Sequence, residues 1–418
     1  MAGPLLTVLV GAGGAVDLGV PSTTELTDHV VAHLTKDWGC LSRTFDRRDP
    51  DATWERGKVL ADRLIDQARR YHGDKFNFEN LLNILEALAT LEDSHARGRK
   101  TAEALLLEPK DWVKELLDGT FTKSAAHEVH CAIHAAVAKA TDKDRVQADG
   151  RPWTAFQRLW MDLAGQTKLT SVTLNYDTLI EQALNSGPDA QGFSRIDGED
   201  LWQFDDRPSG RTPTVMHLHG SIHLGYRRSV LDPDPLRWRY THKDLFWYSD
   251  PAQAYSSWGS IDPENHTQAE RTAIGGPIIT GLQKPDKLLV EPYSTYYCRF
   301  GRQLAEVPRL LVVGYGFDDP HVNQLLYGMR RRHGDALRIA VITKFDPVEM
   351  HGMYGSWADE RANENDMIAR WSTRWEPFGG LSLRAYPWDS KNGVKVYYRG
   401  LAEILDDGWE DLLRFLLT

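Results

Sequence analysis

The stretch LLTVLV, residues 5–10, runs directly into GAGGAVDLGVP, residues 11–21. A nearly continuous apolar run of this kind is typical of a strand buried on both faces, as in a parallel sheet covered by helices on each side. Glycines after such a strand let the main chain approach a phosphate group, and the N-terminus of a following helix favours negative charge. Ser22 and Glu25 have the spacing of a capping box, so we predict that this helix begins at Ser22. A tight turn that binds no ligand is the alternative interpretation of the glycines.

Four further segments have the same character, because each is an apolar or β-rich run that ends at a polar or glycine-containing turn. The predicted strands are Thr170–Leu174, Thr214–His219, Arg309–Val313 and Ile339–Thr343. Ligands of open α/β sheets bind outside the carboxyl ends of the strands, so the turns are expected to meet at one crevice. The predicted fold class is α/β, with a Rossmann-like, doubly wound parallel sheet.

Helix-spaced apolar positions dominate the region between the first two predicted strands. We predict a domain over residues 1–345 that is interrupted by a large helical insertion at 36–165, followed by a C-terminal extension at 346–418 with a use in assembly. Residues 227–275 are rich in Pro, Asp, Trp and Tyr and are interpreted as a long insertion or lid. The helices predicted within the insertion are Asp51–Tyr71, Asn77–Leu91, Thr101–Leu117, Ala125–Ala140 and Pro152–Leu163.

Composition argues against several classes of protein. The formal net charge is -10 over 418 residues, whereas nucleic-acid binders carry a basic surplus or stripe. Cys40, Cys131 and Cys298 are far apart and form no CxxC pair, which argues against a disulfide framework and a four-cysteine zinc site. The first residues fit a strand better than a signal peptide, and no segment reaches the roughly 18 apolar residues of a membrane span. We expect a soluble cytoplasmic protein that binds neither membrane nor nucleic acid directly.

Two polar motifs follow predicted strands. In TLNYD, residues 173–177, Asn175 and Asp177 are two positions apart and point the same way from an extended segment. Either residue could instead cap a helix that begins near Thr178. In HLHGSIH, residues 217–223, His219 lies at a strand end before a glycine, which suits a general base at a crevice. A metal site would need a third ligand that the motif does not show, so hydrogen-bonded structural roles are the better interpretation of the other two histidines, His217 and His223.

A third motif, LLVVGYGFDDPHVNQLL, covers residues 310–326. Here a buried strand leads into Gly314-x-Gly316, and glycines at this position allow close approach by a nucleotide. A helix is expected to begin near Pro320, with Asp318 or Asp319 as its cap.

The order of these features resembles the sirtuin family over roughly residues 5–35 and 168–345. It looks closest to the sirtuin-like (Sir2-like) NADases of bacterial antiphage defence, in which segments like residues 77–88, 292–300 and 312–323 recur. The zinc cysteines and the strand that clamps an acetyl-lysine peptide in the deacetylases are missing. Pro21-Ser-Thr-Thr24 also replaces the Asp-Phe-Arg segment of those enzymes.

The resemblance implies NAD+ as the substrate and no metal. Asn175 would order the attacking water and the nicotinamide ribose, Asp177 would hold the nicotinamide side, and His219 would act as the base. Ala12 and Gly13 would sit at the phosphates, and Thr343 would lie against the adenine ribose. The residues expected to bind NAD+ are Gly11, Ala12, Gly13, Gly14, Asn175, Gly314, Gly316 and Thr343.

The activity implied is that of an NAD+ glycohydrolase, giving nicotinamide and ADP-ribose as a regulated antiphage effector. A module that binds NAD+ or ADP-ribose without turnover is the alternative. The missing zinc module disfavours a deacylase, and Val16 in place of the third glycine of GxGxxG disfavours an ordinary Rossmann oxidoreductase. The resemblance also implies a homo-oligomer, sometimes joined to a ring-shaped HerA-type ATPase, as the means of control.

Overall fold

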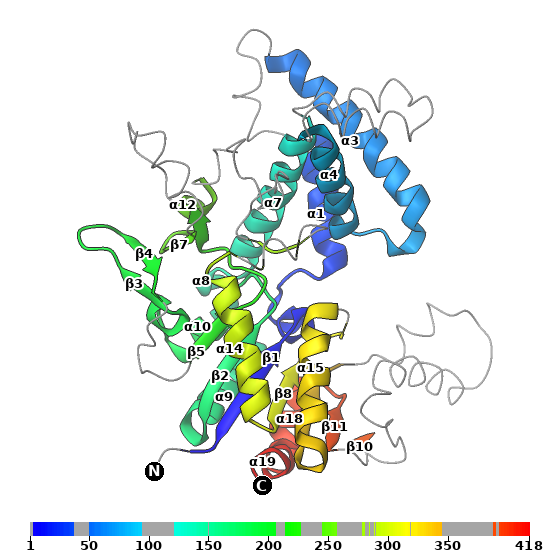
Figure 1. The fold of residues 1–418 in the computed structure, drawn as a ribbon. Coiled ribbons are helices and arrows are strands. Elements are labelled where there is room, and N and C mark those ends of the chain that lie inside the picture. Colours follow the sequence, from blue (N-terminus) through cyan, green and yellow to red (C-terminus); the bar gives the residue numbers. More distant parts are fainter. Residues whose placement is uncertain are drawn as a thin grey trace, which may run out of the picture.

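The structure is a computed structural model, and the helices and strands that it describes are shown in Figure 1. Its described residues are 3–36, 50–93, 121–148, 150–205, 214–226, 245–256, 278–280, 284, 288, 290–317, 319–344, 388–389 and 393–418. The predicted helix Thr101–Leu117, Asp318, most of residues 227–275 and residues 346–387 lie outside these ranges.

A seven-stranded sheet forms the centre of the molecule, and six of its strands are parallel. The parallel strands lie in the order β5-β2-β1-β8-β9-β11, which is the doubly wound order with its switch point between β1 and β8. The predicted Rossmann-like α/β fold is confirmed. The strands are β1 (Leu5–Val10), β2 (Lys168–Thr173), β5 (Thr214–His217), β8 (Arg309–Val313), β9 (Arg338–Ile342), β11 (Val394–Tyr397) and the antiparallel edge strand β10 (Trp388–Asp389).

The alternation of side chains along β1 explains its continuous apolar sequence. Val8 and Val10 pack into the core on one face of the sheet, and Leu9 packs into the core on the other. The first face is covered by α9 (Arg151–Gln166), α10 (Leu179–Leu184), α18 (Leu401–Asp407) and α19 (Trp409–Leu417). The second face is covered by α14 (Tyr293–Glu306) and α15 (Pro320–His333), as Figure 1 shows.

Two segments that the sequence placed outside the sheet domain pack against its core. α9, within the predicted insertion, buries Phe156 and Trp160 against the first face. Residues 388–418, within the predicted C-terminal extension, supply β10, β11, α18 and α19. β11 pairs in parallel with β9 from Val394↔Ile339 onward, because Val394 and Val396 face one layer of helices while Tyr397 faces the other.

Four helices form a second core beside the carboxyl ends of the strands, and we call them the helical unit (Figure 1). They are α1 (Thr23–Lys36), α3 (Pro50–His72), α4 (Phe78–Asp93) and α7 (Phe121–Ala140). α1 begins one residue after the predicted capping-box serine, whose N–H and hydroxyl both donate to Glu25 Oε2, at 2.7 and 2.9 Å. No helix among the described residues is long and apolar enough to cross a bilayer.

A second, four-stranded antiparallel sheet has the order β3-β4-β7-β6. Its strands are β3 (Phe193–Arg195), β4 (Leu201–Phe204), β7 (Leu245–Tyr248) and β6 (Leu224–Tyr226). The remaining short elements are α8 (Lys143–Ala148), α12 (Pro251–Ser256), η1 (Ala12–Gly14), η2 (Val16–Leu18), η3 (Gly73–Lys75), η4 (Pro188–Gln191) and η6 (Gly334–Ala336).

The turn after β8 tests how closely the sheet domain is packed. Gly314 has φ 61, and a Cβ on it would lie 1.9 Å from the Gly14 nitrogen. We therefore expect Gly314→Ala to lower the free energy of unfolding by about 3 kcal/mol or more, through a disfavoured φ and a main-chain clash. Urea unfolding followed by far-UV circular dichroism measures the change.

The matched control is Gly328→Ala in α15, where a Cβ would meet nothing within 4 Å. This variant should be more stable by about 0.5–1 kcal/mol, because alanine loses less backbone entropy than glycine in a helix. Equal stability of the two variants would contradict the close contact of the turns.

Candidate functional site

Two adjoining cavities open at the carboxyl ends of the parallel strands. The larger has a volume of about 580 Å³ and the smaller about 330 Å³, and Gly13 and Gly314 line both. The larger is lined by the predicted site residues Gly11, Ala12, Gly13, Asn175, Asp177, His219, Gly314 and Gly316. The smaller is lined by the predicted residues Gly13, Gly14, Gly314 and Thr343. The structure thus brings every residue of the predicted site to one continuous region.

The glycine turn after β1 crosses the glycine turn after β8 at very short range. Gly11 N–H donates to Val313 O and Gly13 N–H donates to Gly314 O, both at 2.9 Å. A Cβ on Gly13 would lie 2.9 Å from that same Gly314 oxygen. These glycines are therefore required first for the contact between the two turns. The resemblance places Gly13 at the phosphates, and its N–H is already engaged within the protein.

Asn175 and Asp177 project from the segment that follows β2, and both are buried. Asn175 N–H donates to Thr173 Oγ1 at 3.0 Å. Asp177 Oδ1 accepts a hydrogen bond from Leu179 N–H at 3.1 Å, at the start of α10, while Oδ2 has no partner among the described residues. The helix-start interpretation of this motif therefore accounts for one carboxylate oxygen of Asp177 and not for the other.

Burial controls the ionisation of Asp177. Removal from water disfavours the carboxylate and raises the pKa of Asp177 to about 6, and the hydrogen bond from Leu179 N–H opposes this shift only in part. The charge of His217 also opposes the shift, yet Oδ2 has no partner among the described residues, and a carboxylate oxygen of this kind is suited to stabilising a positive charge on a ligand.

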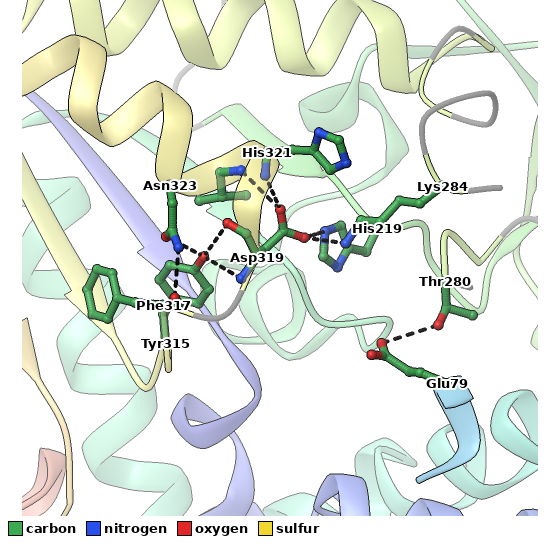
Figure 2. A network of polar contacts seen from close by, with 10 residues as sticks. Glu79, His219, Thr280, Lys284, Tyr315, Phe317, Asp319, His321 and Asn323 are labelled. Carbon is green, nitrogen blue, oxygen red and sulfur yellow. Dashed lines mark hydrogen bonds and ion pairs between the residues drawn. The ribbon is translucent and has the colours of Figure 1, made fainter. Parts of the chain in front are cut away.

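His219 lies two positions beyond the end of β5 and is 9% exposed. Its Nε2 is 3.1 Å from Asp319 Oδ2, and the Lys284 ammonium forms an ion pair with the same oxygen (Figure 2). Burial lowers the pKa of His219 to about 4, and the pairing with Asp319 offsets this only in part. His219 is therefore neutral near pH 7. A neutral imidazole carries one hydrogen, and with that hydrogen on Nε2, the nitrogen beside the carboxylate, Nδ1 is the nitrogen that can accept a proton.

Asp319 serves two structures at once. Its Oδ1 caps α15 by accepting from the N–H groups of His321 and Val322, at 2.9 and 3.0 Å, which confirms Asp319 as the predicted cap. Its Oδ2 holds His219 and Lys284. Burial alone would raise the pKa of Asp319, but these two partners outweigh burial and hold it well below its usual range.

The loop between β8 and α15 is fixed by hydrogen bonds around Tyr315. The Tyr315 hydroxyl accepts from Asp319 N–H at 3.2 Å and donates to Asn323 Oδ1 at 2.9 Å. Asn323 Nδ2 donates to the carbonyl oxygen of Phe317, whose φ is 60. Figure 2 shows these residues on the side of Asp319 away from Lys284. The loop thereby presents Asp319 to His219 in a fixed orientation.

The helical unit supplies residues that the sequence did not identify as part of the site. Glu79 and Asn83 of α4 line the larger cavity, and their i, i+4 spacing places them on one face of the helix. Glu79 Oε1 accepts from Thr280 Oγ1 at 3.2 Å (Figure 2). Thr280 follows Ile279, whose N–H donates to His219 O at 2.7 Å. Lys284, Glu79 and Thr280 carry no local sequence signal, although Glu79 lies in the recurring segment at 77–88.

The structural interpretation of the two other histidines of the HLHGSIH motif agrees with their contacts. His223 Nδ1 lies 2.7 Å from Tyr248 O, and its ring stacks on Trp247 with centroids 4.8 Å apart. His217 is fully buried, and its Nε2 lies 2.6 Å from Glu181 Oε1. Among the described residues, no group of His, Cys, Asp and Glu is arranged to hold a metal ion.

Comparison with known proteins gives a family match for part of the chain. Residues 170–365 match the family model of the SIR2-like domain. No curated protein gives a significant match. The matched range contains Asn175, Asp177, His219 and Asp319. The resemblance to Sir2-like proteins is therefore confirmed. SIR2-like domains bind NAD+, which indicates an NAD+-related activity.

The raised pKa of Asp177 has a consequence for stability. The pKa of Asp177 is higher in the folded than in the unfolded protein, so the free energy of unfolding falls as the pH rises from about 4 to about 6. Above about pH 6 this loss of stability stays constant. We expect Asp177→Asn, which keeps the acceptor for Leu179 N–H, to raise the free energy of unfolding at pH 7.5 by about 2–3 kcal/mol. Urea unfolding at a series of pH values measures the difference.

The same titration contains its own control. Below about pH 4 both folded and unfolded wild-type protein carry a protonated Asp177, so the two variants should have the same stability there. A gain that does not depend on pH would show that burial of the charge is not its cause.

Proposed function

We propose that this chain, which carries a SIR2-like domain, is an NAD+ glycohydrolase that transfers the ADP-ribosyl group of NAD+ to water. The observation that carries the proposal is the neutral, buried His219, which is held by Asp319 in the same cavity as Asn175 and Asp177. A neutral imidazole beside an amide and a carboxylate can accept a proton and stabilise a cation without a metal.

The two cavities suit a dinucleotide. Their combined size falls within the range of ligand pockets, and they meet at the crossing of the two glycine turns. In the proposed orientation, the nicotinamide ribose lies in the larger cavity and the adenosine in the smaller one, where Thr343 lines the wall. The pyrophosphate then passes the turns at Gly13 and Gly314, where the absence of side chains leaves room for it.

The reaction breaks the bond between nicotinamide and ribose and forms a bond from water to the same carbon. Nicotinamide leaves with the bonding electrons as a neutral base, the sugar carries positive charge in the transition state, and water loses one proton. Asp177 supports the positive charge, Asn175 orients the water and His219 Nδ1 accepts the proton. Placement of water and sugar contributes several kcal/mol to such a reaction, and a general base adds about 10²- to 10⁴-fold.

Water is the proposed acceptor because the zinc module and peptide-clamping strand of the deacetylases are missing from the sequence. The helical unit lines the larger cavity with Leu26, Phe78 and Val137 beside the polar Glu79 and Asn83. Apolar residues here limit the water that reaches the sugar, which favours one ordered nucleophile.

Release of nicotinamide tests the proposal directly. Purified protein is incubated with NAD+, and nicotinamide is followed by chromatography for the wild type, Asn175→Ala and His219→Ala. We expect both variants to lose at least about 100-fold in kcat, since each removes a group that acts in the transition state. The matched control is His321→Ala, which removes a nearby imidazole but keeps the main-chain N–H that binds Asp319, and its rate should stay close to that of the wild type.

Wild-type rates in the Asn175 and His219 variants would contradict the assignment. Calorimetry with NAD+ and ADP-ribose separates the alternative function. Tight binding by all variants without nicotinamide release from any of them would favour a module that binds the nucleotide without turnover.

Control by assembly is part of the proposal, with an antiphage effector as the biological role and a HerA-type ATPase as the partner. The supporting observation is that α4, in the helical unit outside the matched range, lines the cavity. A contact that moves α4 would change the site. We expect light scattering to show a homo-oligomer, with or without NAD+. A monomer under both conditions would contradict this part of the proposal.

A further inference from the structure

We propose that His217, through its buried pairing with Glu181, is a positioning residue that fixes the main chain of Asn175 at the cavity. The inference rests on the proposed function in taking Asn175 as a residue of the active site. The arrangement of hydrogen-bond donors that it requires can nevertheless be measured without turnover.

The two ring nitrogens of His217 face two different acceptors. Nε2 lies 2.6 Å from Glu181 Oε1, and Nδ1 lies 3.3 Å from the carbonyl oxygen of Asn175. A carbonyl oxygen only accepts, so Nδ1 must carry a hydrogen. The side chain is 0% exposed, which leaves no water to replace either partner.

Glu181 Oε1 lies where two nitrogen-bearing side chains meet. Its Oε1 also accepts from Gln191 Nε2 at 2.8 Å, and the Gln191 carbonyl accepts from the Tyr296 hydroxyl of α14 at 2.6 Å. Oε1 thus accepts from Gln191 Nε2 and also lies within hydrogen-bond distance of His217 Nε2. A hydrogen on Nε2, in addition to the one on Nδ1, makes His217 an imidazolium with both nitrogens donating.

The charged groups around His217 support this form. Burial by itself lowers the pKa of His217, but the charge and hydrogen bond of Glu181, together with the charge of Asp177, outweigh burial and raise the pKa. Burial lowers the pKa of the neighbouring His223, and the charge of His217 adds to that shift. Two carboxyl groups thus face the ring from the segment after β2 and from α10.

The consequence concerns the peptide units around Asn175. Its N–H donates to Thr173 Oγ1 at 3.0 Å, and its carbonyl accepts from His217. Asn175 is therefore held on both sides while its side chain lines the cavity. His219, two residues after His217, pairs with Asp319 and is neutral. The motif thus combines one charged histidine that positions with one neutral histidine that reacts.

A purely structural role would not require this chemistry, because buried ion pairs can often be replaced by apolar residues of similar size without loss of stability. A structural role and a positioning role of the His217–Glu181 pair therefore predict different results when the pair is replaced. Loss of the pair should leave the fold intact and impair turnover if the pair positions Asn175.

Nitrogen NMR of the full-length protein with labelled histidine tests the donor arrangement. Near neutral pH we expect one imidazole with both nitrogens protonated and shielded from solvent exchange, which disappears in His217→Lys and persists in His333→Leu. His333 is the control because its Nε2 also lies near a main-chain carbonyl, that of Leu304, outside the cavities. A His217 ring without a proton on Nδ1 overturns the proposal.

Kinetics of three variants test the positioning role. Replacing the pair by His217→Leu with Glu181→Met should lower kcat about tenfold or more and leave KM within about threefold. His217→Lys keeps a cationic donor at this position and should retain most of the rate, and His333→Leu should match the wild type. A folded double variant with wild-type kcat overturns the proposal.

Failure of the proposed function has a different signature. A wild-type protein that releases no nicotinamide would contradict the glycohydrolase assignment, whereas the NMR result would still decide the protonation of His217. If the double variant does not fold, the NMR result and the rate of His217→Lys decide. Protonation of both His217 nitrogens, together with a retained rate in His217→Lys, supports the proposal. A His217 ring with no hydrogen on Nδ1 overturns it.

Discussion

Close contact between two glycine turns is the constraint on which the site depends. The turns follow β1 and β8, the strands at the switch point of the sheet, and hydrogen bonds at 2.9 Å join Gly11 to Val313 and Gly13 to Gly314. The space for a Cβ is already occupied by main-chain atoms of the opposite turn. Because the turns touch, the two cavities meet there, and a ligand can extend from the ends of β2 and β5 to the ends of β8 and β9.

The charges at the site depend on the hydrogen-bond and ion-pair partners of three buried carboxyl groups. Asp319 and Glu181 each hold a histidine, but Asp319 also holds Lys284 and the first turn of α15, so it can remain ionised beside a neutral His219. Asp177 has a single main-chain donor and a raised pKa. The cavity thus keeps one acid whose ionisation is disfavoured by burial. The free energy that this acid costs the fold is a property of the site rather than a packing defect.

The strands, the glycine turns and the trio of Asn175, Asp177 and His219 could be predicted because their signals are local. Periodicity gives a strand, the residue after a strand is placed by the sheet, and parallel strands bring such residues to one edge. Asp319 could be predicted only as a helix cap. Its position before Pro320 indicates the capping contacts of Oδ1, but nothing in the local sequence indicates that Oδ2 pairs with His219 and Lys284. Lys284 and Glu79 come from segments whose approach to the cavity depends on tertiary packing, for which spacing carries no information. The engagement of Gly13 N–H was likewise invisible, because its acceptor lies about 300 residues away along the chain.

The smaller cavity is completed by residues that come late in the chain. Gly400, Leu401 and Glu403 line that cavity beside Thr343, and they follow β11, which pairs with β9. During synthesis, the ribosome completes β1, β2, β5 and the helical unit long before it reaches these residues. A nascent chain therefore contains Asn175 and His219 before the wall of the smaller cavity is complete. The order of translation thus sets the moment at which both cavities are complete: it comes only after residues 400–403 have been made.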